Sequence, residues 1–226
     1  MDLSFLYQYY GFFLTGVKNT VLISIFTVFL GVIFGIFIAL MRLSNNKILK
    51  TISTAYIEFV RGTPIMVQLF IVYYGLPSIG IPLPTIPGMG SEASDILAGI
   101  ITLSINSTAY VAEIIRGGIN SVNKGQMEAA RSLGLTNAMA MKTVIIPQAF
   151  KNILPALGNE FITVIKESSI VSIIGVPELM YNADTVRGNT FKAFAPLLVA
   201  AVLYFLLTFT LSKILSIFER RMATSD

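Results

Sequence analysis

Long apolar stretches recur along the chain, separated by short segments that hold most of its charged residues. Four of them stand out, at residues 20–41, 62–91, 96–112 and 193–212. A helix needs about 20 residues to cross a hydrocarbon core of about 30 Å. Three of the stretches reach that length alone, and residues 96–112 reach it with their flanks. The pattern therefore predicts membrane-spanning helices.

A fifth stretch, residues 144–176, is apolar except for Lys151, Glu160, Lys166 and Glu167. Two buried amphipathic helices of a soluble protein would give the same pattern. The stretch is long enough to cross a membrane, however, and charged groups within a membrane face the protein interior. We therefore expect an all-α integral membrane protein with five transmembrane helices, in which residues 1–226 form a single transmembrane domain.

Basic residues are distributed unevenly between the segments that join these stretches. Those expected on one side hold only Lys18, Arg187 and Lys192. Those on the other side hold Arg42, Lys47, Lys50, Arg116, Lys124, Arg131, Lys142, Lys213, Arg220 and Arg221. Cytoplasmic loops are rich in Lys and Arg, so we expect the amino terminus outside and the carboxyl terminus inside. The proline- and glycine-rich segment 76–95 is then an outer loop, either a landing surface for a binding protein or a compact turn.

Composition supports a membrane protein and removes most enzyme chemistry. The chain is 54% hydrophobic and 12% charged, too few polar residues to coat a water-soluble globule. It has no His and no Cys, so imidazole and thiol catalysis and soft-metal ligation are absent. No GxxxxGK[ST] phosphate loop occurs either. We expect no catalytic residue, no metal site and no bound cofactor, with any ATP hydrolysed by another chain.

A polar helix pattern interrupts the apolar series at residues 127–147. Glu128 and Arg131 lie three residues apart on one helical face, and Ala129 and Ala130 allow a partner to approach closely. Gly134 supplies a stop for the helix. A helix of this composition belongs in water, so the loop around residues 120–142 is a candidate docking element.

The motif Glu128-Ala129-Ala130, with Gly134 four residues on and then Ile146-Pro147, resembles the cytoplasmic loop of permease subunits in ATP-binding cassette (ABC) importers. Other motifs in the same order widen the resemblance to permeases for polar amino acids, namely Arg61-Gly62-Thr63-Pro64 with Gln68, residues 154–159, and residues 176–179. The resemblance implies a multi-pass protein of the bacterial cytoplasmic membrane. It also implies a second permease chain, two cytoplasmic ATPase subunits that contact the coupling helix, and an external solute-binding protein. Whether the second chain is identical or a sister subunit stays open, and no nucleic acid partner is expected.

Glu160 is the candidate for contact with the transported solute. An ionisable group within a membrane is costly and is by default a functional hypothesis. A helix places Glu160 on one stripe with Thr163 and sets Asn159 beside it. The resemblance aligns Asn159 and Glu160 with the stretch beside the solute in permeases for basic amino acids. We therefore expect arginine, lysine or histidine as the solute, with Gln68 and Asn106 completing the candidate site.

Alternatives remain at this stage. Glu160 could instead pair with Lys151 or with Arg61, although a nine-residue spacing turns Lys151 half a turn away. A secondary transporter or channel could use Glu160 and Glu167 to carry protons or ions, but would not need a docking loop. Two i,i+3 pairs, Glu58 with Arg61 and Glu113 with Arg116, indicate ion pairs at the cytoplasmic end or part of a gate. The roles of Lys166, Glu167 and Asp184 are not defined.

Overall fold

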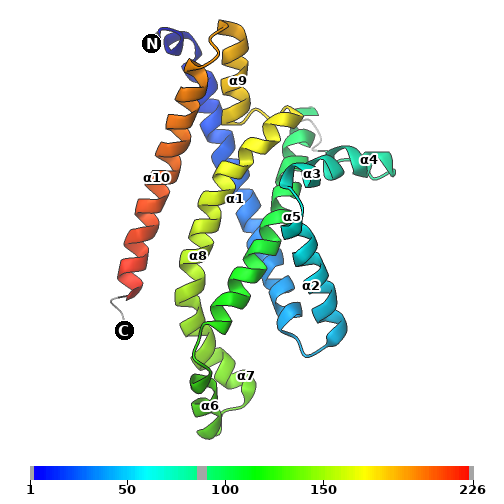
Figure 1. Ribbon diagram of the computed structural model, residues 1–226, viewed down its shortest axis with the longest axis vertical. Helices are drawn as coiled ribbons and strands as arrows, with labels where there is room; N and C mark the ends of the chain where they lie inside the picture. The colour runs from blue at the N-terminus through cyan, green and yellow to red at the C-terminus, as the bar shows by residue number, and fades with distance from the viewer. Residues whose placement is uncertain (1–2, 86–90, 224–226) are drawn as a thin grey trace.

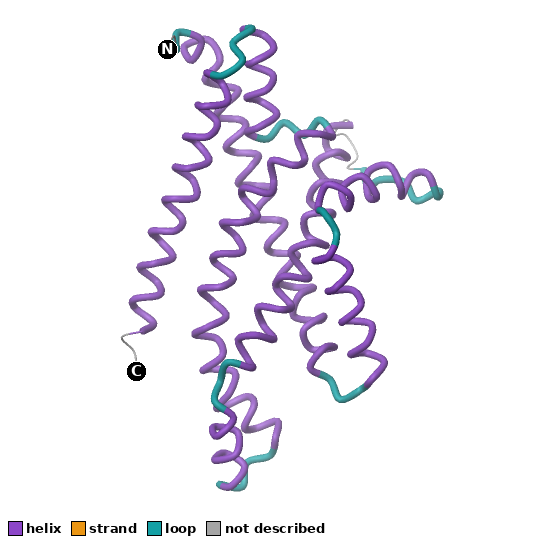
Figure 2. Tube along the Cα trace, viewed as in Figure 1, coloured by secondary structure: helices purple, strands orange, loops and turns teal. Residues whose placement is uncertain are grey.

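The computed structural model describes residues 3–85 and 91–223, and within these ranges the ordered elements are helices, with no strand. Figure 1 and Figure 2 show an elongated bundle in which the long helices run roughly along one axis. The α-helices are α1 (Phe5–Leu43), α2 (Lys47–Gly62), α3 (Ile65–Phe70), α4 (Leu76–Ser78), α5 (Ser91–Asn120), α6 (Lys124–Ser132), α7 (Asn137–Ala140), α8 (Ile146–Glu167), α9 (Leu179–Thr190) and α10 (Ala195–Ala223). Two π-helical turns (Ile71–Gly75 and Met141–Ile145) and a 3-10 helix (Ser168–Ile174) complete the chain.

Three helices, α1, α5 and α10, are long and apolar enough to cross a membrane, and a bent pair of shorter helices raises the number to four. Helix α8 has 22 residues and is about 33 Å long, enough to cross, but it is less apolar than these helices. The prediction of an all-helical membrane protein is thus confirmed. Five spans, with α8 as one of them, remain a prediction.

The three basic segments lie toward the same end of the bundle. In Figure 1 the turn between α1 and α2, the pair α6 and α7, and the final part of α10 point toward the lower end. The start of α1, helix α9 and helix α4 lie toward the upper end. This arrangement agrees with the orientation expected from the Lys and Arg count, which stays a prediction.

The second apolar stretch differs from the straight span expected over residues 62–91. Its helix begins earlier, at Lys47, and breaks at Thr63 and Pro64, where the chain bends by 107°. Thr63 is extended, as expected of a residue before proline, because the proline ring disfavours the helical conformation there. The outer loop is also shorter than predicted, since α5 already begins at Ser91; residues 86–90 of that loop lie outside the described residues.

Helix α5 packs closely against α1 at the centre of the bundle. Gly31 and Gly35 face it, and a Cβ atom on either would lie within 3.0 Å of the Ser107 or Val111 side chain. Small residues at four-residue spacing allow such close approach of helices in membranes. α5 is the most enclosed of these three apolar helices, with 67% of its most apolar 18-residue segment buried.

A buried carboxylate joins three helices at the start of α9. Glu178 is fully buried and caps α9, accepting a hydrogen bond from the Tyr181 backbone N–H at 2.8 Å. Its other oxygen accepts from the Tyr204 hydroxyl of α10 at 2.5 Å and from the Thr20 hydroxyl of α1 at 3.4 Å. Glu178 therefore ties three helices together through neutral donors.

Candidate functional site

Helix α6 is the polar helix expected from the sequence, and both of its ends are capped. The Asn123 side chain accepts a hydrogen bond from the Gly125 N–H at its start. At its end Gly134 adopts a left-handed conformation with φ 87°. The Leu135 N–H then reaches the Ala130 carbonyl at 3.2 Å and the Gly134 N–H reaches the Arg131 carbonyl at 3.0 Å. These two bonds form a Schellman motif, so the predicted role of Gly134 as the stop is confirmed.

The candidate docking residues of α6 do not all face outward. Ala130 is buried against the chain, whereas Glu128, Ala129 and Arg131 are exposed. Arg131 donates to the Leu135 carbonyl oxygen at 2.6 Å, which fixes the segment that follows the helix. Leu133, which sequence reasoning did not single out, is 83% exposed beside them. Helix α6 thus packs on its neighbours through Ala130 and leaves an exposed leucine near its end, and in Figure 1 it projects beyond the bundle together with α7.

Glu160 is buried near the middle of α8, with 8% of its surface exposed. Its carboxylate accepts a hydrogen bond from the Ser107 hydroxyl of α5 at 2.8 Å. Ser107 was not predicted as a site residue; the signal that could have found it is the run of hydroxyl side chains inside the apolar stretch 96–112. The donor is neutral, so this bond leaves the charge of an ionised carboxylate uncompensated.

Two other predicted site residues, Gln68 and Asn106, contact each other. Asn106 Nδ2 donates to Gln68 Oε1 at 3.0 Å, and both side chains are buried. Since Asn106 precedes Ser107 in α5, the Gln68 contact and the Glu160 contact arise from consecutive residues of one helical turn. The structure therefore places four buried polar side chains from three helices around this turn.

The remaining predicted residues lie on α8 but not in this cluster. Asn159 is exposed in the single chain, and its side chain donates to the Pro155 carbonyl oxygen at 3.2 Å. Thr163 is half-buried on the same helix. Asn159 and Thr163 thus border the Glu160 position without a direct hydrogen bond to it among the interactions of the described residues.

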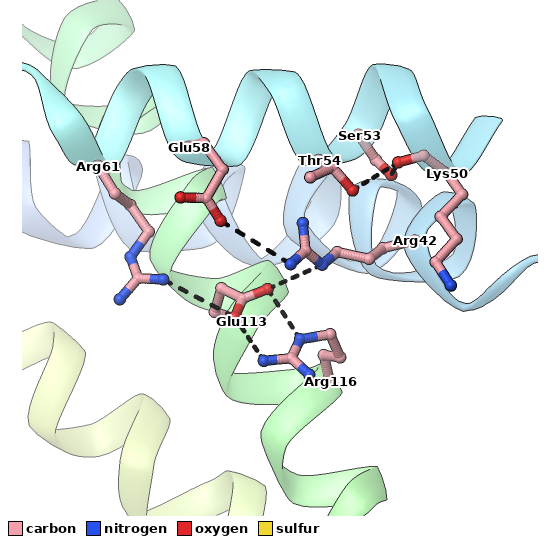
Figure 3. Close-up of polar contacts among 8 residues, drawn as sticks. All are labelled: Arg42, Lys50, Ser53, Thr54, Glu58, Arg61, Glu113 and Arg116. Atoms are coloured by element: carbon pink, nitrogen blue, oxygen red, sulfur yellow. Dashed lines mark hydrogen bonds and ion pairs between the residues drawn. The ribbon is translucent and has the colours of Figure 1, made fainter. Parts of the chain in front are cut away.

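A cluster of charged side chains lies further along α1, α2 and α5 (Figure 3). Arg116 donates both Nε and Nη2 to the Glu113 carboxylate, at 2.9 and 2.8 Å, which confirms that predicted pair. Arg42 and Arg61 also approach Glu113, at 3.2 and 3.7 Å. The predicted pairing of Glu58 with Arg61 is wrong, because Glu58 instead lies 3.9 Å from Arg42 and Arg61 points toward Glu113. One carboxylate therefore holds three guanidinium groups from three helices.

A bundle of apolar helices with a buried polar turn and a capped polar helix beyond its end is consistent with the transmembrane subunit of a transporter. The sequence matches the family described as "Binding-protein-dependent transport system inner membrane component" over residues 31–224, and the chain belongs to this family. In this family the ATPase is a separate subunit.

Individual relatives agree with the family match. The chain is 39% identical to the arginine transport system permease protein ArtQ of Bacillus subtilis (strain 168), over 95% of this chain and 94% of the relative. It is 37% identical over the full length of both chains to a protein of the same organism named as a probable glutamine ABC transporter permease, GlnM. A crystal structure of an amino acid ABC transporter with histidines superimposes with a TM-score of 0.91 at 49% identity, covering 98% of this chain and 99% of the other.

Proposed function

We propose that the chain is the permease subunit of an ABC importer that moves amino acids, and basic ones in particular, into the bacterial cytoplasm. The observation that carries the charge preference is Glu160, a buried carboxylate whose hydrogen-bond donor is the neutral hydroxyl of Ser107. A cationic side chain would supply the compensating charge that Ser107 lacks. Among the relatives, names refer to arginine and to glutamine, so the fold alone does not select between charged and neutral solutes.

The solute would enter beside Glu160, with Asn159 and Thr163 on the same helix and Asn106 on α5 as neighbouring polar groups. Asn159 is exposed in the single chain, which suits a position between this chain and a second permease subunit. Gln68 accepts a hydrogen bond from Asn106. These assignments follow from placement and chemistry, and Glu160 is the residue on which they depend.

The remaining partners follow from the family. Of the two cytoplasmic ATPase subunits, one would dock against α6 of this chain through Glu128, Ala129, Arg131 and the turn at Gly134, while Ala130 holds the helix against its own chain. An external solute-binding protein would deliver the amino acid, and ATP would be hydrolysed by the partner, with no cofactor held by this chain. Family membership and the capped α6 favour an importer over a secondary transporter or channel, which has no use for such a helix.

The test is uptake by the complete importer, reconstituted in liposomes with its ATPase and binding protein. Glu160→Gln keeps the side-chain shape and removes the charge. A hydrogen bond to a charged group contributes about 1.5 to 3 kcal/mol, so the affinity for arginine should fall by roughly one to two powers of ten. Uptake of glutamine, if the wild type transports it, and basal ATP hydrolysis should be unchanged.

Glu58→Gln is the matched control, because Glu58 is largely exposed and its nearest guanidinium is 3.9 Å away. Arginine transport that is indifferent to Glu160→Gln, or a wild-type importer that accepts only neutral or acidic amino acids, would contradict the proposed charge preference.

A further inference from the structure

The bend between α2 and α3 leaves a buried carbonyl without its usual donor. In a continuous helix the N–H of residue 64 would bond to the carbonyl of Val60, but Pro64 has no N–H. Val60 is only 4% exposed, so water is not at hand as a substitute. A buried carbonyl without a donor is costly. The side chain of Gln68 supplies the shorter of two replacement bonds, with Nε2 donating to the Val60 carbonyl oxygen at 2.7 Å, while the Thr63 hydroxyl lies 3.4 Å from the same oxygen.

The same amide group is fully occupied by its neighbours. Nε2 also lies 3.1 Å from the Thr63 carbonyl oxygen and 3.0 Å from the Thr63 hydroxyl, both at the bend itself. Oε1 accepts from Asn106 at 3.0 Å. Gln68 is 7% exposed. A solute could bond to Gln68 only by displacing one of these contacts, and each of them spans the break in the helix or joins it to α5.

We propose that Gln68 is a positioning residue that holds the α2–α3 bend closed and anchors it to α5 through Asn106, in place of the direct solute contact expected from the sequence. The bend sets the direction of the last turn of α2, where Arg61 meets Glu113. Asn106 in turn precedes Ser107, which holds Glu160. Gln68 therefore links the polar turn of α5 to the end of α2, the helix that carries Arg61. The inference does not depend on the charge of the solute, and only its uptake measurement rests on the proposed function.

The bend can be measured directly because the chain has no cysteine of its own. Spin labels on cysteines at the exposed positions Ile52 and Tyr74 lie on the two arms of the bend. A straight helix at 1.5 Å per residue would separate these backbone positions by about 33 Å. Arms of about 17 and 16 Å bent by 107° bring them to about 20 Å. Pulsed electron–electron double resonance resolves this difference.

In the absence of solute, Gln68→Met should broaden the distance distribution and shift it to longer values, because methionine has the length of glutamine but cannot donate. Adding Pro64→Ala restores an N–H opposite the Val60 carbonyl. The double variant should then give a narrow distribution again, centred nearer the straight-helix distance. Gln8→Met, at an exposed glutamine of α1, is the matched control and should leave the distribution as in the wild type.

Uptake separates a positioning role from a ligand role. Gln68→Met should lower the maximal rate about tenfold, on the order of the loss of one buried hydrogen bond, with KM within twofold of the wild type. A large rise in KM with an unchanged distance distribution would make Gln68 a solute ligand and overturn the proposal. An unchanged distribution in Gln68→Met would by itself overturn it too. The distance measurement needs no solute, so failure of the Glu160 hypothesis would leave it intact.

Discussion

The turn at Gly134 allows a graded test of how α6 is coupled to its partner. Gly134 has φ 87°, and a Cβ added there would meet no atom of this chain within 4 Å. An L-residue with a side chain in the left-handed conformation costs roughly 1–2 kcal/mol, and Asp and Asn fall at or below the low end of that range. A negative charge at the end of a helix adds about 0.3–1 kcal/mol. Gly134→Asp therefore carries up to about 2 kcal/mol of local cost, enough to weaken the cap of a nine-residue helix that is marginal by itself.

The assay is ATP hydrolysis by the assembled importer, measured with and without solute-loaded binding protein. Gly134→Asp should abolish the stimulated rate while the membrane bundle stays folded. Gly134→Asn matches the size of aspartate but tolerates the left-handed conformation. If the partner needs close backbone approach, Asn and Asp both lose stimulation. If the conformation alone matters, Asn retains most of it and Gly134→Ala loses more.

Gly188→Ala is the control, since Gly188 also has open space around its Cβ position but an ordinary φ. Its helix, α9, lies at the opposite end of the bundle from α6 (Figure 1). Full stimulated hydrolysis and normal uptake by Gly134→Asp would refute the assignment of α6 as the coupling helix.

Three further outcomes concern the stability of the bundle, measured by unfolding in detergent. Glu113→Gln should lower the free energy of unfolding by about 2–4 kcal/mol, because three guanidinium groups lose a shared, mostly buried counter-charge. Glu58→Gln should lower it by less than about 1 kcal/mol. Equal losses in the two variants would contradict the central role of Glu113. Gly35→Ala should lower the free energy of unfolding by about 1–3 kcal/mol, since its Cβ would lie 2.6 Å from Val111 Cγ1. The double variant Gly35→Ala with Val111→Gly should lose clearly less stability than the sum of the two single variants. A loss equal to that sum would show that the clash is not the cause. Burial raises the pKa of Glu178 above its ordinary value of 4.5, so the folded chain keeps this proton to higher pH than the unfolded chain. Wild-type stability should therefore fall as pH rises from about 4.5 through the raised pKa. Glu178→Gln should lack that decline, and parallel plots of stability against pH for the two proteins would exclude a contribution from Glu178.

Much of the architecture follows from one-dimensional patterns. Apolar runs of sufficient length predict helices that cross a membrane, and α1, α5 and α10 meet that expectation. The stop at Gly134 was predictable because glycine acts locally. The bend at Pro64 had the same local signal, but residues 62–91 contain no charged residue, and the apolar run concealed the break.

The candidate site was less predictable because its contacts join distant residues. Periodicity places Glu160 on a face of α8 but does not say which helix lies opposite, so Ser107, 53 positions away, was missed. The partners of Arg61 and Glu58 depend on how α1, α2 and α5 pack against one another, which no local spacing encodes. Glu178 was noticed only as part of a motif, since its partners Thr20 and Tyr204 come from opposite ends of the chain.

The enclosed position of α5 has a consequence for how the protein is made. The most apolar 18 residues of α5 have a mean hydropathy of 1.3, against 2.9 for those of α1 and 2.1 for those of α10. Only 6% of that segment of α10 is buried. α1 and α10 can partition into lipid on their own hydropathy, whereas α5 gains most of its favourable surroundings from protein neighbours. The polar side chains that equip α5 for its central place thus make it the helix whose membrane insertion depends on a partner already present. Since α1 precedes it in the chain and offers Gly31 and Gly35 as a close-packing face, the order of synthesis supplies that partner in time.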